Sequence, residues 1–132
     1  MKLVVEQTGS KGPITAVIVA ECRQKLLDKK QQILNQSASL RAEFQSRDRS
    51  GDEGDQSVEV LAEHQFFSTQ ERLHGQLLEI EYALARIETG QFGICEETEE
   101  WIELERLRAI PWTRLSIEGA EMRETLQKRF AR

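Results

Sequence analysis

Side chains that could do chemistry are sparse in this chain of 132 residues, and two carboxylates near its middle stand out. Asp52 and Asp55 are three residues apart in the segment GDEGDQS, where they could reach a metal ion or a basic surface of another protein. On spacing alone a structural role is the stronger explanation, because aspartate is favoured in turns and Asp55 can cap a following helix. The spacing alone leaves both interpretations open.

The two histidines do not form a recognisable site. His64 and His74 are ten residues apart in one predicted helix, which is not the spacing of a paired metal site such as HExxH. The sequence also contains no glycine-rich phosphate loop, no GxSxG motif and no Cys-His pair with local support. We therefore expect a protein that is not an enzyme.

The segment GQFGICEETEEW begins like a zinc knuckle but supplies a single thiol, Cys95, with Thr98 where a second cysteine would stand. A structural zinc ion needs four ligands, mostly Cys and His. The region from residue 90 onward offers one cysteine, no histidine and many glutamates of the kind found on solvated faces. The sequence therefore predicts no bound zinc and no other cofactor.

Composition narrows the class of partner and the compartment. A net charge of -5 and a pI near 5.2 argue against a protein that grips nucleic-acid backbone, so a protein partner is expected. Cys22 and Cys95 are too few for a disulfide framework, which favours the cytoplasm. The first 22 residues lack a continuous apolar core, so neither a signal peptide nor a membrane span is expected.

The elements that carry these residues follow from hydrophobic spacing. A first stretch repeats an aliphatic residue every seven positions, at Val19, Leu26, Ile33 and Leu40. It contains no Gly or Pro between residues 14 and 45, and Pro13 suits the first turn of a helix. A long helix with one apolar seam is predicted.

A second stretch has the a and d spacing of a heptad repeat, at Phe66, Leu73, Leu77, Ile80, Leu84 and Ile87. Between the two stretches, SRDRSGDEGDQS interrupts the pattern with two glycines and several Ser and Asp. Two helices with a short connection bury their seams by folding back on each other. We predict an antiparallel coiled-coil hairpin over residues 14–89 with its tip at 46–56, preceded by an N-terminal segment, 1–13.

The carboxyl-terminal part lacks the heptad pattern of the two long stretches. Gly90 and Gly93 end the second helix, and short apolar runs then alternate with acidic residues as far as Pro111. We predict a small irregular head over residues 90–115. A last helix is expected over 116–132, with Ser116 as its cap. An alternative architecture is a helical bundle completed by self-association.

Within this frame, ALARIETGQFGICEET followed by IELERLRAIPWTRLSIEGAE resembles the DksA/TraR family of bacterial transcription factors. The resemblance covers about residues 20–126. It implies a mainly α fold, with a long two-helix hairpin, a small zinc-finger-like head and a C-terminal helix. It also implies a monomer that binds RNA polymerase through the secondary channel and modulates transcription initiation, without binding DNA directly.

The resemblance assigns candidate contact residues for the polymerase. The family's tip motif Asp-x-x-Asp-x-Ala falls on Asp52, Asp55 and Ser57, so both acids are kept and the alanine is not. A family arginine that helps docking falls on Arg72. The tip carboxylates are expected to approach the catalytic centre of the polymerase as charged probes rather than catalysts.

Two family sites are degenerate in this chain. The four zinc-ligand positions fall on Cys95, Thr98, Ser116 and Gly119, so the head must keep its shape by packing. That packing is expected to involve Phe92, Ile94, Trp101, Ile102, Leu104, Leu107 and Trp112. The positions that hold guanosine tetraphosphate, the alarmone of the stringent response, fall on Glu79, Ile110 and Ala120. None of these three can neutralise a phosphate, so a lost or weakened nucleotide site is expected.

Two further readings stay open. The heptad seams could instead dimerise two chains, which would make this a helical assembly protein. The acidic tip could alternatively act in the same channel on transcript cleavage or elongation rather than on initiation.

Overall fold

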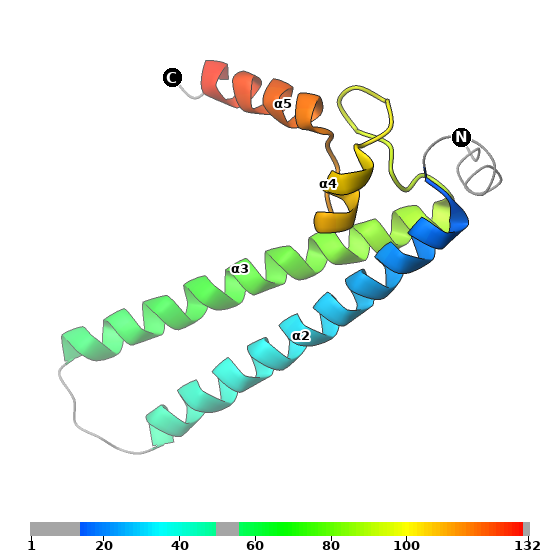
Figure 1. Cartoon of the computed structure of the whole chain (residues 1–132). Helices are drawn as coiled ribbons and strands as arrows, with labels where there is room; N and C mark the ends of the chain where they lie inside the picture. The colour runs from blue at the N-terminus through cyan, green and yellow to red at the C-terminus, as the bar shows by residue number, and fades with distance from the viewer. Residues whose placement is uncertain (1–13, 50–55, 131–132) are drawn as a thin grey trace. The chain divides into compact units, whose positions relative to one another are not determined.

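The structure, a computed structural model, describes residues 14–49 and 56–130, which form four helices (Figure 1). The two long helices are α2 (Ala16–Arg49) and α3 (Gln56–Thr89), with 34 residues each. They are followed by α4 (Leu104–Ala109) and α5 (Ile117–Phe130). The mainly helical fold and the antiparallel pairing of the two long helices, both predicted from the sequence, are confirmed.

The chain divides into two compact units. The head unit comprises Met1–Leu27 and Glu79–Arg132, and the hairpin unit comprises Asp28–Leu78. Each long helix therefore contributes residues to both units. No helix in the described ranges is long and apolar enough to cross a membrane.

The hairpin unit is held together by a narrow apolar seam between α2 and α3. Ile33 and Leu73 are 2% exposed, and Leu40 and Leu77 are half-buried. Leu34, which stands beside the seam in the sequence, is 40% exposed. The reason is geometric. When two helices pack side by side, each buries only about one side chain per turn of the other, so the neighbouring positions stay exposed.

Three phenylalanines extend this seam along the hairpin unit. The rings of Phe44 on α2 and Phe66 on α3 are stacked, with centroids 4.2 Å apart and planes 9° apart. Phe67 meets the Phe66 ring edge-on at 5.1 Å. Offset and edge-on pairs of this kind stabilise helix contacts beyond their area burial. The cluster gives the seam a defined shape where the aliphatic heptad residues end.

The head unit has the better-formed core. Its buried members come from both long helices and from the carboxyl-terminal segment: Ile14, Ile18, Cys22, Leu26, Ile80, Ala83, Phe92, Cys95, Ile102 and Leu107. Phe92, Ile102 and Leu107 are thus buried as the sequence predicted. Ile94, Trp101, Leu104 and Trp112 are half-buried. The core of the head is therefore packed from apolar side chains, with Cys95 among its buried residues.

Glycine and serine set the boundaries of the head. Gly90 has a φ of 77° and ends α3, with its amide donating to Ile87 O at 3.3 Å. Gly93, with a φ of 94°, packs so closely on Ile14 that an added Cβ would lie 3.1 Å from Ile14 Cγ1. Ser116 caps α5 as predicted, because its Oγ accepts from Gly119 N at 3.0 Å.

Candidate functional site

The four degenerate ligand positions come together around one sulfur atom in the head unit. The Ser116 hydroxyl donates to Cys95 Sγ at 3.4 Å, and Thr98 also forms a hydrogen bond with Cys95. Gly119 lies against the same sulfur, since a Cβ added there would come closer than 3.0 Å to Cys95 Sγ. The family resemblance implied that the four positions lie together, but it did not indicate the hydrogen bonds that Ser116 and Thr98 make with the sulfur.

This arrangement does not fit a zinc ion. Its donors are one thiol and two hydroxyls, whereas zinc sites in proteins use thiolate, imidazole and carboxylate ligands. Gly119 supplies no side chain, and the sulfur of Cys95 occupies the space that one would need. Across the described ranges, no group of three or more His, Cys, Asp or Glu residues is placed to hold a metal ion.

The thiol of Cys95 is electrostatically unusual. Burial raises its pKa, but side-chain and backbone hydrogen bonds from Ser116 and Thr98 outweigh burial and lower the pKa from 9.0 to about 7. A thiolate at this position is stabilised by fixed dipoles instead of a metal. The opposite holds for Cys22, whose pKa is raised by burial on α2.

The turn that follows Cys95 keeps the form of a knuckle. Cys95 N donates to Glu100 O at 2.8 Å, and Glu99 N donates to Cys95 O at 2.9 Å. Glu99 has a φ of 61°, a left-handed conformation that favours glycine. A side chain in that conformation costs roughly 1–2 kcal/mol. The turn is therefore held by its hydrogen bonds against local strain.

An ion-pair network joins α3, this turn, the loop before α5 and α5 itself. Arg114 binds the Glu79 carboxylate with two hydrogen bonds, of 2.8 and 3.2 Å, and lies 3.5 Å from Glu96. Arg123 lies 2.7 Å from Glu97 and 3.6 Å from Glu96. The hydrogen bond to Glu79 raises the pKa of Arg114, so the guanidinium of Arg114 stays charged. The side chains are partly exposed, so each pair contributes modestly and the network matters more than any single pair.

The degenerate nucleotide positions are only partly brought together. Glu79 and Ile110 line an open cavity of about 510 Å³ in the head unit, together with Arg106, Trp112, Thr113, Arg114, Leu115 and Arg123. Ala120, half-buried on α5, is not part of that lining. The arginines there are already engaged by partners within the unit, including Glu79, Glu97 and the Leu115 carbonyl.

The expected polymerase contacts belong to other segments. Asp52 and Asp55 lie outside the residues that the structure describes. Ser57 is exposed in the first turn of α3, and Arg72 is exposed further along the same helix.

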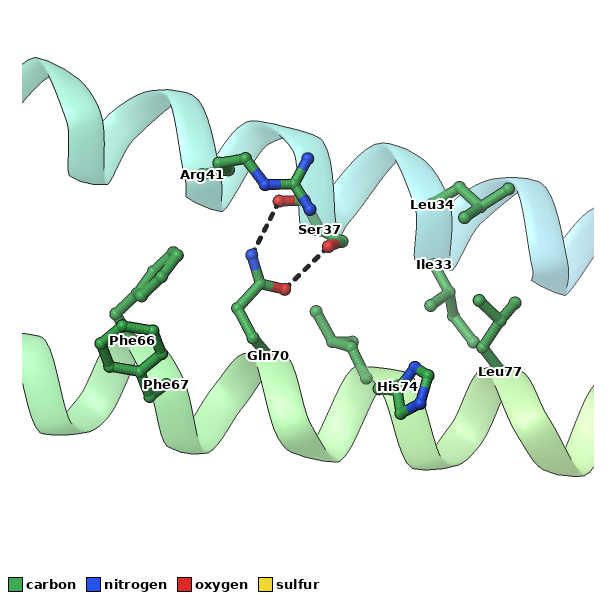
Figure 2. A pocket seen from close by; sticks show the side chains of 10 residues that line it. Ile33, Leu34, Ser37, Arg41, Phe66, Phe67, Gln70, His74 and Leu77 are labelled. Carbon is green, nitrogen blue, oxygen red and sulfur yellow. Dashed lines mark hydrogen bonds between the residues drawn. The ribbon is translucent and has the colours of Figure 1, made fainter.

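Sequence reasoning missed one polar contact in the hairpin unit. The Ser37 hydroxyl donates to Gln70 Oε1 at 2.7 Å, and Gln70 Nε2 donates to Ser37 O at 3.2 Å (Figure 2). These side chains line a cavity of about 440 Å³. A signal was available: the spacing of Phe66 and Leu73 leaves out one heptad position, and Gln70 occupies it.

Comparisons with known proteins agree with this architecture. A family model for the prokaryotic dksA/traR C4-type zinc finger matches residues 90–124. The RNA polymerase-binding transcription factor DksA of Caulobacter vibrioides is 33% identical over 114 residues, which cover 80% of this chain and 75% of that protein. An uncharacterised protein of Aquifex aeolicus is 38% identical over 111 residues, covering 79% of this chain and 74% of that one.

A solved structure extends the likeness to three dimensions. Transcription factor DksA2 from Pseudomonas aeruginosa matches with a TM-score of 0.81 and 26% identity. The match covers 93% of this chain and 97% of that one.

Proposed function

The chain belongs to the DksA/TraR family of transcription factors, and we propose that it binds RNA polymerase directly through the secondary channel and modulates transcription initiation. The observation that carries this proposal is the 33% identity, across 80% of the chain, to a protein named as an RNA polymerase-binding transcription factor. The shared fold supports it, with a TM-score of 0.81 to a second transcription factor.

The paired long helices suit the proposed role. Each has 34 residues, so each extends about 50 Å, enough to carry a small connecting segment into a deep channel. The connecting segment contains Asp52 and Asp55, which act as negative groups near the catalytic centre of the polymerase. Ser57 replaces a small apolar contact there, and Arg72 contributes to docking through its exposed position on α3.

The head performs its structural role without zinc. Cys95 is the one thiol among the four ligand positions, and its sulfur fills the space beside Gly119. Hydrogen bonds from Ser116 and Thr98 stabilise the thiolate, and the ion pairs of Arg114 and Arg123 join the surrounding segments. A head of this kind keeps working when zinc is scarce, because its folding is not coupled to metal binding.

The protein acts without guanosine tetraphosphate at the family's shared site. Glu79 would repel a phosphate group, and its carboxylate also neutralises Arg114, the basic group nearest to it in the cavity. Ile110 offers no charge. The nucleotide would therefore have to break the ion pair between Arg114 and Glu79 before its phosphate could bind Arg114.

Transcription from a sensitive promoter with purified polymerase tests the proposal. Asp52→Ala and Asp55→Ala are expected to leave polymerase binding intact and to weaken the regulatory effect. Glu63→Ala, an exposed acid on α3 outside the connecting segment, is the matched control and should change neither quantity. Failure of the unaltered protein to bind polymerase would overturn the proposal, and tip variants with full effect would remove the role of the two carboxylates.

The proposed active form is a monomer, because both apolar seams are already used within one chain. Light scattering distinguishes this from assembly through the seams: a monomer supports the polymerase proposal, and a stable dimer favours the assembly reading.

A further inference from the structure

The apolar seam of the hairpin does not by itself define how the two helices are aligned along their length. Within the hairpin unit, Ile33 and Leu40 are seven residues apart on α2, as are Phe66 and Leu73 on α3. A slide of one heptad, about 10 Å, would again place large apolar side chains opposite one another. Because apolar burial is not directional, such a displaced pairing retains much of its stabilisation.

The contact between Ser37 and Gln70 is directional. Both side chains are half-buried, and both ends of the Gln70 amide are used, one by the Ser37 hydroxyl and one by the Ser37 carbonyl. Figure 2 shows the amide reaching across from α3, with apolar side chains on either side of it. One residue of α2 therefore engages both the oxygen and the nitrogen of the amide.

Displaced pairings lose this match. Seven residues to either side of Ser37 stand Lys30 and Phe44, and neither supplies a hydroxyl. The half-buried Gln70 Oε1 would lose the hydroxyl that donates to it, which is unfavourable even when the surrounding apolar contacts are kept. A single polar pair at a core heptad position can fix the register of a coiled coil in this way.

We propose that Ser37 and Gln70 are a positioning pair that fixes one register of the hairpin, and that the regulatory effect depends on this register. The functional part of this inference rests on the proposed role in transcription. The stacked rings of Phe44 and Phe66 act with the pair, because a displaced register would separate them. The pair contributes alignment rather than stability, as polar groups in coiled-coil seams do.

The register can be measured on the full chain without polymerase. Spin labels attached through Gln45→Cys and Glu63→Cys sit at exposed positions on opposite arms, and the native cysteines are at most 1% exposed. The unaltered pair should give one distance. Gln70→Leu should add a second population, displaced along the arm by up to about 10 Å. Ser37→Thr keeps the hydroxyl and should keep the single distance.

Gln76→Leu is the matched control, since it makes the same chemical change at an exposed position of α3. It should leave the distance unchanged. Thermal unfolding of each variant separates alignment from folding: Gln70→Leu is expected to melt no lower than the unaltered chain, because leucine suits the seam. One unchanged distance in Gln70→Leu would overturn the proposed register role, whatever the protein does to transcription.

Transcription assays then test positioning. Gln70→Leu is expected to keep its polymerase affinity within about two-fold while losing most of its maximal effect. A purely structural role would not separate affinity from effect in this manner. A displaced register with full regulatory effect would overturn the functional part. An unaltered chain with no effect on polymerase would refute the proposed function instead, and the distances would still decide the register.

Discussion

Replacing Gly119 by alanine tests whether the head has closed over the space of a missing ligand. The added Cβ would lie closer than 3.0 Å to Cys95 Sγ, 3.3 Å from Ser116 Oγ and 3.4 Å from Glu97 Cβ. The sulfur is buried and cannot turn away into solvent, so either the α5 cap or the turn containing Cys95 must shift. The substitution is therefore expected to destabilise the protein although alanine is the better helix former.

The magnitude follows from opposing contributions. Overpacking of a tight site costs about 1–3 kcal/mol, and disturbance of the Ser116 cap adds about 1 kcal/mol. The higher helix propensity of alanine relative to glycine offsets about 1 kcal/mol of this cost. The free energy of unfolding should fall by about 1–3 kcal/mol, which lowers the melting temperature by roughly 4–15 °C for a chain of this size.

Thermal and urea unfolding measure this change, and Gly75→Ala provides the matched control. Gly75 is also helical, but a Cβ added there has nothing within 4 Å. That variant should be stabilised by about 0.5–1 kcal/mol. If Gly119→Ala were as stable as Gly75→Ala, the space beside Cys95 would be open, and the idea of a head closed by packing would be wrong.

Four more predictions concern the head. Because hydrogen bonds lower the Cys95 pKa from 9.0 to about 7, the folded thiolate should add stability that grows as the pH rises from 7 to 9, on the order of 3 kcal/mol, and is lost below pH 7. Cys95→Ser should remove this pH dependence of stability, and an unchanged dependence would assign it to another group. Dialysis against a chelator should move the melting temperature by less than about 1 °C, and a large fall would reveal a structural metal. Glu99→Gly should raise the free energy of unfolding by about 1 kcal/mol, since φ is 61° there, and destabilisation would contradict the strain. Guanosine tetraphosphate should not enhance the regulatory effect on a polymerase lacking other nucleotide sites, and a clear enhancement would show that Arg114 can leave Glu79.

Heptad spacing was enough to predict the hairpin. Residues seven apart, such as Ile33 and Leu40, must face the same side of a helix, and two apolar faces on helices joined by a short segment have few other ways to be buried. The glycines after α3 and the serine before α5 likewise fixed boundaries through local backbone chemistry alone.

The contacts inside the head were harder to predict from the sequence. Apolar residues such as Phe92 and Leu107 were expected in its core and are buried there, but the pattern does not show which polar atoms surround Cys95. The resemblance indicated that Ser116 and Gly119 lie next to a turn about 20 residues earlier, but the hydrogen bonds that replace the metal there depend on the folded geometry and not on spacing. The pairing of Glu79 with Arg114 was missed for the same reason.

Competition for RNA polymerase tests the account most directly. The metal-stripped protein would be titrated into a complex of polymerase with a zinc-containing member of the family, and release of that member would be measured with and without added zinc. We predict displacement at one chain per polymerase with identical affinity in both conditions. Simultaneous binding of both factors, or displacement only when zinc is supplied, would contradict the account.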